Sequence, residues 1–348
     1  MKILSLGTMR NMSNTCLHRH WALQKIADHI DVINTHEKAV TLWYRIANVL
    51  FQWGLPISFP DNSSENKKLR QMIAKSIDVP YDVIWINKGL TINAETLRYV
   101  KEVMPTAKIV SYSSDNMVLR HNQSQNFLDC IPLYDIHFTT KSYVIDQLKE
   151  LGAVDVVFTN KHYEKSFHYP RLLTQDEKDR LGGDVGFIGT WEKERCDSLI
   201  YLAKNGIKVK VFGGGKWNKY KNIENLEISP GIFSEDYSKA LQAFKISLCF
   251  LRKINSDTQT SRTMEIPACG GFMLAERTDE HLGLFEEGME AEYFSTNEEL
   301  LKKCRYYLAH DEERELIAAA GTLRCETSGY SNDDSINRML KYVMKNAQ

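Results

Sequence analysis

The feature that most constrains this chain is a repeated alternation of short apolar runs with longer amphipathic segments. Such runs, bounded by turn residues, are typical of buried strands, and the segments between them show the period of helices. Strand-then-helix repetition predicts an α/β fold with parallel sheets covered by helices on both faces. Strands are expected at residues 3–6, 82–86, 109–112, 136–139 and 154–158, and again at 185–188, 209–212, 226–228, 246–251, 272–275 and 291–294.

The length of the chain indicates two domains, because 348 residues exceed one core of ordinary size. The alternation breaks around His168-Tyr169-Pro170 and the polar stretch TQDEKDRLGGD, and then restarts. Ligands of such sheets bind beyond the carboxyl ends of the strands. We expect an N-terminal Rossmann-like domain, a linker, a second Rossmann-like domain and a final helix, at residues 1–168, 169–183, 184–328 and 329–348.

The composition argues against several classes of protein. With 44 basic and 45 acidic side chains, the net charge of −1 does not favour nucleic acid or an anionic membrane as a partner. Seven scattered cysteines without a C-x-x-C pair are expected to be free thiols, and the histidines follow no metal-ligand spacing. The start, MKILSLGTMRN, is expected to be a first core strand, which predicts a cytoplasmic protein.

One aromatic-rich stretch, VTLWYRIANVLFQWGLPI, allows two interpretations. As a helix, it could rest on the inner face of a membrane, near a lipid-linked acceptor. Alternatively, it packs against the first sheet. Its sparse basic residues favour this second interpretation.

Three segments of the second half lie where strands should end. The first, GFIGTWEKER, runs from a strand through Gly189 to Arg195 at the head of a helix, which suits a phosphate or a plain turn equally. The second, VFGGGKW, lets a ligand approach Gly213 and Gly214 closely but matches no known phosphate-binding fingerprint; Lys216 beside it adds a cation.

The third segment, SDTQTSRTMEIPACGGFMLAE, begins a helix with hydroxyls and an arginine. The hydroxyls of Thr258, Thr260 and Ser261, together with Arg262, suit an anion at the first helical turn. Glu265, one turn further on, suits a diol such as a ribose, because its carboxylate can accept hydrogen bonds from both hydroxyls. The structural alternative is a surface ion pair between Arg262 and Glu265.

The run RTMEIPACGGFMLAE and the following EHLGLFEEGMEAEYFSTNEELLKKCRYYL resemble the CgeB-like (spore-maturation-protein-like) glycosyltransferases, which are related to the retaining group 1 transferases. The likeness covers roughly residues 80–345 and is strongest over 185–310. It implies the GT-B fold, in which two Rossmann-like domains face each other across a cleft and the C-terminal helix packs back on the N-terminal domain.

The resemblance also implies roles for individual residues. Glu265 matches the second glutamate of the family's E-x7-E motif and would hold the ribose, while the first glutamate falls on Asp257. The family's phosphate-binding arginine and lysine fall on Thr190 and Arg195, so one cation is missing, and Arg262 would replace it. The expected donor site comprises Gly189, Thr190, Arg195, Gly213, Gly214, Lys216, Gly231, Ile232, Thr258, Thr260, Ser261, Arg262 and Glu265, with Tyr237 shaping the wall near the base.

The acceptor is expected on the N-terminal domain. Gly7 ends the first strand, and Asn11, Ser13 and Asn14 follow it as hydrogen-bonding candidates. Asp115, directly after a strand, suits either a catalytic acid or base or a simple helix cap. With Asp257 and Glu265 it completes the set of catalytic candidates. A D-x-D pair for a divalent cation is not evident in the sequence, which favours a metal-independent site.

The function implied is transfer of a sugar from a nucleoside-diphosphate sugar, with UDP expected ahead of GDP, to a hydroxyl of a glycan or lipid-linked glycan. One alternative is the modification of nucleic-acid bases, supported only by a basic rim at Lys67, Lys68, Arg70 and Lys75. Another is a non-catalytic sugar-nucleotide-binding protein, which the departures at Asp257 and Thr190 keep open. Turnover of a nucleotide sugar distinguishes an enzyme from a binding protein.

Overall fold

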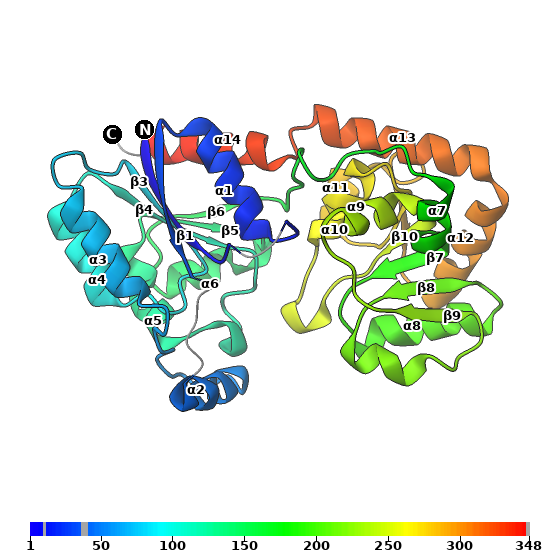
Figure 1. The fold of residues 1–348 in the computed structure, drawn as a ribbon, viewed down its shortest axis with the longest axis horizontal. Helices are drawn as coiled ribbons and strands as arrows, with labels where there is room; N and C mark the ends of the chain where they lie inside the picture. Colours follow the sequence, from blue (N-terminus) through cyan, green and yellow to red (C-terminus); the bar gives the residue numbers. More distant parts are fainter. Residues whose placement is uncertain (10–11, 36–40, 346–348) are drawn as a thin grey trace. The chain divides into compact units, whose positions relative to one another are not determined.

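The protein, described here by a computed structural model over residues 1–9, 12–35 and 41–345, consists of two units (Figure 1). Unit 1 comprises Met1–Asn160 and Asp333–Gln348, and unit 2 comprises Lys161–Asn332. No helix within the described part of the chain is both long and apolar enough to cross a membrane.

Unit 1 contains a six-stranded parallel sheet in the order β2-β1-β3-β4-β5-β6. The chain reverses its direction of travel across the sheet between β1 and β3, and ligands of such sheets bind at that point. Strand β2 was not predicted, because it is a half-exposed edge strand whose sequence, HIDVIN, has no continuous apolar run. The strands are β1 (Lys2–Gly7), β2 (His29–Asn34), β3 (Val83–Asn87), β4 (Lys108–Ser113), β5 (Ile136–Thr139) and β6 (Val156–Phe158).

Helices cover both faces of this sheet. On one face, α3 and α4 bury Leu69 and Leu97 against β1 and β3. On the other face, α1 and the C-terminal helix α14 bury Leu23 and Leu340 against Trp85. The final helix thus completes the core of unit 1. The helices are α1 (Thr15–Ile26), α2 (Leu42–Gln52), α3 (Glu65–Lys75), α4 (Ala94–Val103), α5 (Gln125–Cys130), α6 (Ile145–Glu150) and α14 (Asn332–Lys345).

Helix α2 differs from the expectation that it packs against the first sheet. It buries only Ala47 and Phe51, and Phe51 contacts Phe59 with ring centroids 5.1 Å apart. The helix carries apolar side chains on its outer side as well, so that one stripe is exposed: Leu42, Trp43, Ile46, Val49 and Trp53. The sequence did not reveal this, because both sides of the helix are apolar.

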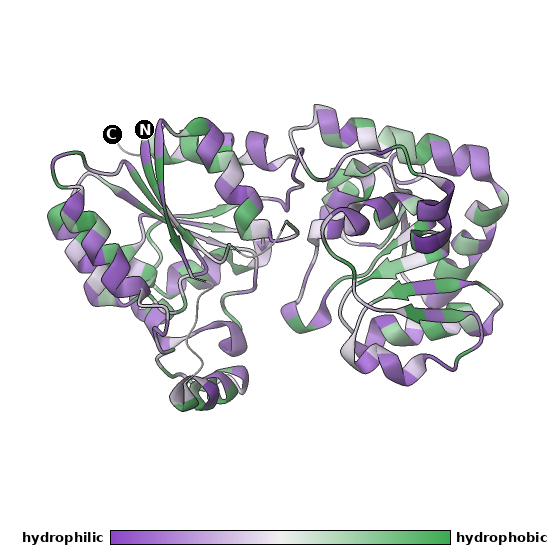
Figure 2. Ribbon diagram, viewed as in Figure 1, coloured by the Kyte–Doolittle hydropathy of each residue, from purple (hydrophilic) through white to green (hydrophobic). Residues whose placement is uncertain are grey.

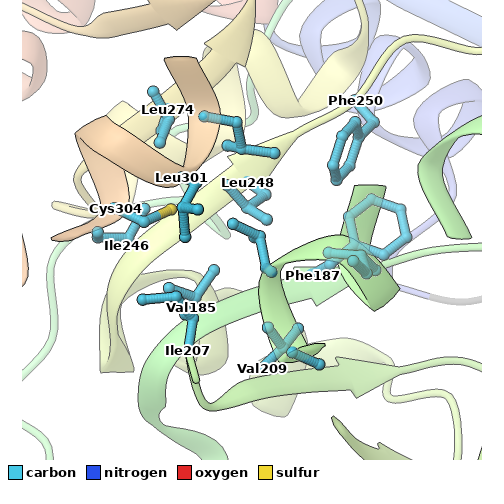
Figure 3. Close-up of a cluster of buried hydrophobic side chains, with 14 of the residues drawn as sticks. Val185, Phe187, Ile207, Val209, Ile246, Leu248, Phe250, Leu274, Leu301 and Cys304 are labelled. Atoms are coloured by element: carbon cyan, nitrogen blue, oxygen red, sulfur yellow. The ribbon is translucent and has the colours of Figure 1, made fainter. Parts of the chain in front are cut away.

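Unit 2 contains a second six-stranded parallel sheet in the order β12-β11-β10-β7-β8-β9. The direction of travel reverses between β7 and β10, so the order is that of a doubly wound dinucleotide-binding sheet. Figure 3 shows the core on one face, where Val185, Leu248 and Leu301 meet. The strands are β7 (Gly183–Ile188), β8 (Val209–Phe212), β9 (Leu226–Ser229), β10 (Phe244–Cys249), β11 (Met273–Glu276) and β12 (Glu292–Phe294).

Helices α8 and α12 cover this face of the second sheet, and α9, α10, α11 and α13 cover the other. Figure 2 shows the result as apolar residues concentrated along the strands and helices with one polar side. The helices are α7 (Gln175–Leu181), α8 (Lys193–Lys204), α9 (Ser234–Ala243), α10 (Ser261–Ala268), α11 (Asp279–Leu284), α12 (Asn297–Ala309) and α13 (Asp311–Thr327).

The segment expected to be a linker, 169–183, lies within unit 2 and forms helix α7 and the start of β7. Thr174 and Glu177 form a capping box at the start of α7, and Glu177 also pairs with Lys239 of α9 at 2.9 Å. The sequence TQDE that was interpreted as polar linker is therefore a helix-start signal. The change between units falls earlier, after Asn160.

Candidate functional site

The site in unit 2 begins at Gly189, which follows β7 at the point where the sheet reverses direction. Trp217 donates a hydrogen bond from Nε1 to the carbonyl of Gly189, at 2.9 Å. A Cβ on Gly213 would lie 2.7 Å from that same carbonyl and would also strike the Trp217 ring. Gly213 is therefore required for the ends of β7 and β8 to pack this closely.

Arg262 brings a positive charge to this turn from the first turn of α10. A Cβ on Gly189 would lie 2.8 Å from Nη2 of Arg262, so the guanidinium rests directly on the glycine. The guanidinium also lies over the Phe187 ring, 5.6 Å from its centroid. Its Nε is buried and has no hydrogen-bond partner among the described residues. Such an atom points to an absent acceptor, because buried polar groups are normally hydrogen-bonded.

Arg195 also lies over the Phe187 ring, 5.4 Å from its centroid, but is used differently from the expectation. Its side chain is 2% exposed, and Nη2 donates to the carbonyl of Leu251 at 2.9 Å. It also pairs with Glu192 at 3.3 Å. Burial lowers the pKa of Arg195 from its ordinary value, and the nearby Arg262 lowers it further. Arg195 therefore ties the β7 turn to the end of β10, although its Nε, like that of Arg262, is buried without a hydrogen-bond partner among the described residues.

The start of α10 presents the expected hydroxyls. Thr260 precedes the helix, and its backbone N–H donates to Oγ1 of Thr263 at 3.0 Å. Ser261 is the first helical residue and is half-buried. Oγ1 of Thr258 is buried and, like Nε of Arg262, has no partner within the described ranges. The positive end of the helix dipole adds to the field of Arg262 at this point.

Glu265 lies one turn further along α10 and is 5% exposed. The hydroxyl of Tyr237 donates a short hydrogen bond to its carboxylate, and Nε2 of His168 lies 3.8 Å from Oε1. Burial raises the pKa of Glu265, while Tyr237, Arg262 and Lys161 act against that shift. Among the described residues, no ion pair within 4.0 Å joins Glu265 to Arg262, so the surface-pair alternative is wrong.

Tyr237 and His168 are the residues that the sequence did not connect to Glu265. Burial raises the pKa of Tyr237 well above its ordinary value, which keeps the phenol protonated as a donor. His168 is buried, and its Nδ1 accepts from the N–H of Glu164 at 3.1 Å. The contact between His168 and Glu265 joins residues almost 100 positions apart, so no local sequence pattern identifies it.

The remaining predicted donor residues lie in turns and loops that follow strands of unit 2. Asp257 accepts a hydrogen bond of 2.7 Å from Nδ2 of Asn255, next to Ser256, which has a left-handed φ of 49°. Lys216 is exposed and places Nζ over the Trp191 ring, at 4.5 Å.

Four further members of the predicted set lie in turns of unit 2. Gly214 lies in the turn after β8, with open space where a Cβ would be. Gly231 and Ile232 lie between β9 and α9, and Ile232 packs with Tyr237 against the same core. Thr190 is exposed after Gly189, and its carbonyl accepts from Arg195 at 3.4 Å.

The predicted acceptor residues lie at the carboxyl end of the sheet in unit 1. Gly7 ends β1 and lies against Asn87 at the end of β3. Ser13 is half-buried, and Asn14 is the N-cap of α1, where its side chain accepts from the N–H of Cys16 at 3.0 Å. Asn11 lies outside the described residues.

Asp115, which follows β4, forms an ion pair of 2.5 Å with Lys88. Lys88 follows β3 with a left-handed φ of 64°, a strained conformation of the kind that clusters at functional sites. No sequence pattern indicated a role for Lys88. The basic residues Lys67, Lys68, Arg70 and Lys75 all belong to α3, where Arg70 is hydrogen-bonded to Thr96.

Across residues 1–9, 12–35 and 41–345, no group of three or more His, Cys, Asp and Glu side chains is arranged to hold a metal ion. All seven cysteines are free thiols, and six of them are buried.

Comparison with known families gives one match. A family model described as "Glycosyl transferase-like" matches residues 195–341, which include α10 and most of unit 2. No curated protein matches the sequence.

Similar solved structures cover nearly the whole chain. Anabaena HepE in complex with UDP and glucose has a TM-score of 0.64 and 11% identity, covering 99% of this chain and 100% of its own. Sucrose-phosphate synthase from Thermosynechococcus elongatus has a TM-score of 0.66 at 10% identity, with 99% and 98% covered. A DNA-modifying β-glucosyltransferase has a TM-score of 0.62 at 13% identity, with 99% and 100% covered. The predicted GT-B fold is confirmed: the chain has the two-Rossmann-domain fold of the GT-B glycosyltransferases, and its residues 195–341 match the glycosyl transferase-like family.

Proposed function

We propose that the protein transfers a sugar from a nucleoside-diphosphate sugar to an acceptor hydroxyl. The observation that carries this proposal is the half-buried side chain of Arg262, held against Gly189 at the reversal point of a doubly wound sheet, with a buried Nε that has no partner among the described residues. A diphosphate supplies the oxygen acceptors and the negative charge that this place lacks.

The donor is bound by residues that all belong to unit 2. Arg262 and the N–H groups at the start of α10 hold the diphosphate, which Gly189 and Gly213 allow to approach the backbone closely. Glu265, positioned by Tyr237, accepts hydrogen bonds from the ribose hydroxyls. Asp257 contacts the sugar.

UDP is the nucleotide we propose first, and GDP second. The support is that HepE, a structure of the same fold, was obtained with UDP-glucose, at a TM-score of 0.62 and 12% identity. The wall beside Gly231 and Ile232 would then contact the base.

The reaction proposed is metal-independent and retains the anomeric configuration. Arg262 and the dipole of α10 stabilise the charge that develops on the leaving diphosphate, which is the usual role of preorganised donors in group transfer. The departing phosphate then takes the proton of the acceptor hydroxyl. If the reaction instead inverts, Asp115 is the base, and its ion pair with Lys88 orients the side chain.

The acceptor proposed is a glycan, and helix α2 suggests that it is lipid-linked. The segment 41–60 contains two tryptophans and Arg45 but no acidic residue, and the stripe of Leu42, Trp43 and Trp53 is exposed. Tryptophans and arginine on an exposed amphipathic helix suit the interface of an anionic bilayer.

Co-sedimentation tests this membrane contact. The protein should sediment with phosphatidylglycerol vesicles, and Trp43→Ser with Trp53→Ser should abolish the effect. Replacing the exposed Leu316 of α13 by serine is the control, because that side chain is 72% exposed and lies outside α2. Equal sedimentation of both variants would exclude α2 as the contact.

Release of UDP from UDP-sugars, with glycan acceptors added, tests the enzymatic proposal. We expect turnover with at least one sugar and a loss of about 100-fold in Glu265→Gln. Nucleotide binding without turnover for any sugar would instead support a non-catalytic binding protein.

A further inference from the structure

Unit 1 contains a buried guanidinium, that of Arg19, which the proposed reaction does not use. Arg19 belongs to α1, and its side chain is 5% exposed. Nε donates to Oδ1 of Asn87 at 2.9 Å, and Nη2 donates to Sγ of Cys16 at 3.2 Å. The guanidinium also lies over the Tyr112 ring, 4.2 Å from its centroid.

All of these partners are neutral. Within the part of the chain that the structure describes, no carboxylate pairs with Arg19. Burying a cation without an anion is unfavourable, because the lost hydration is not replaced by a full opposite charge. Replacing Arg19 should therefore not lower the stability of the ligand-free protein. A purely structural role of the side chain predicts the opposite, a loss of stability.

The position of Arg19 is that of a ligand site in this type of sheet. Asn87, which orients it, ends β3, and Gly7 ends β1; the chain reverses direction between these two strands. A Cβ on Gly7 would lie 2.9 Å from Nδ2 of Asn87, so a glycine is needed for the two strand ends to pack. Asn87 is half-buried, so the end of β3 reaches solvent beside the guanidinium, whereas Gly7 is buried.

Neighbouring charges do not neutralise Arg19. Lys88 and Asp115, at the ends of β3 and β4, pair with each other at 2.5 Å. Burial lowers the pKa of His18 to about 4 and also lowers that of His20, so both imidazoles are neutral at pH 7.

Two buried polar atoms lie deeper on the same face of the sheet. Ser5 and Trp85 are paired in register two residues before Gly7 and Asn87. Oγ of Ser5 and Nε1 of Trp85 have no hydrogen-bond partner among the described residues.

We infer that Arg19 and Asn87 bind an anionic group, a phosphate or a carboxylate, on the acceptor. A guanidinium fixed by a neutral amide is the group that recognises planar or tetrahedral oxyanions best. That the ligand is the acceptor rests on the proposed function, but the anion site itself does not. The acceptor is then an acidic or phosphorylated sugar rather than a neutral one.

Isothermal titration of the full chain with three matched sugars tests this inference: glucose, glucose 6-phosphate and glucuronate. Arg19→Gln removes the charge but keeps an N–H that can reach Asn87, and Arg19→Lys keeps the charge. Arg70→Gln is the control, because Arg70 is a partly exposed arginine of the same unit, 3.9 Å from Glu95.

We expect at least one of the two anionic sugars to bind at least tenfold more tightly than glucose. Arg19→Gln should remove that preference, whereas Arg19→Lys should keep part of it and Arg70→Gln all of it. The preferred anion distinguishes a phosphorylated from an acidic acceptor. Equal binding of all three sugars, or an unchanged preference in Arg19→Gln, would overturn the inference.

Thermal unfolding and UDP binding distinguish a ligand-binding role of Arg19 from a structural one. The melting temperature of Arg19→Gln should equal or exceed that of the wild type, and a fall would show that Arg19 is a structural brace. UDP binding, measured on the same samples, should not change, since the donor residues belong to unit 2. A failure of UDP binding in the wild type, with anion selectivity retained, would contradict the proposed function and leave the anion site intact.

Discussion

At the scale of single residues, two arginines of unit 2 share the Phe187 ring but differ in what their donors do. Nε of each has no partner among the described residues, but Arg195 donates from its other two nitrogens to the carbonyls of Thr190 and Leu251. The sequence could indicate that cations lie near this turn. It could not indicate that Arg195 is engaged by Leu251, because that carbonyl lies 56 positions away.

Arg262→Ala should weaken UDP binding by about 1.5–3 kcal/mol, the usual range for a charge-assisted hydrogen bond. The control is Arg305→Ala, which removes an exposed arginine of the same unit. Calorimetric titration with UDP checks the difference. Equal affinities in the two variants would remove Arg262 from the site.

Glu265 makes stability depend on pH in a predictable direction. Burial raises its pKa above the ordinary 4.5, so the folded protein holds this proton more tightly than the unfolded chain. The stability that the protonated form contributes is complete below pH 4.5 and is lost as the pH rises through the folded value. Glu265→Gln should therefore melt higher than the wild type at pH 8, with the gap closing towards pH 4. A gap independent of pH would refute the shift.

At the scale of elements, strand β7 offers a matched pair of glycines. A Cβ on Gly186 would overlap the ring of Phe244, whereas one on Gly183 would make only ordinary contact, at 3.6 Å from Lys210. We expect Gly186→Ala to destabilise unit 2 by about 3 kcal/mol and Gly183→Ala to change its stability little. Urea unfolding of both variants measures this. Similar midpoints would contradict the packing described for β7 and β10.

Most elements could be predicted from the sequence, since buried parallel strands appear as apolar runs. The elements that differ fail for identifiable reasons. Strand β2 is a half-exposed edge strand without an apolar run. Helix α7 starts with a polar capping box whose sequence resembles a linker. Helix α2 is apolar on its exposed side as well. The site was less predictable, because the partners of Glu265, Tyr237 and His168, come from distant segments.

At the scale of the whole molecule, the last helix belongs to the core of the first unit. Leu340 of α14 is 2% exposed and packs in the same cluster as Ile3 and Trp85. Leu340→Asp should therefore lower the free energy of unfolding of unit 1 by about 4 kcal/mol, so that unit 1 unfolds at a lower temperature. UDP binding to unit 2 should persist. Lys341→Asp, at an exposed neighbouring position, is the control. If UDP binding were lost when unit 1 unfolds, unit 2 would not fold and bind its ligand independently of unit 1.

Isothermal titration of the wild type with UDP, GDP and ADP tests whether unit 2 binds a nucleoside diphosphate through Arg262 and Glu265. We predict saturable binding of one nucleotide, UDP, at one site per chain, weakened at least tenfold in both Arg262→Ala and Glu265→Gln. Absence of binding for all three nucleotides, or binding that both variants retain, would contradict the account.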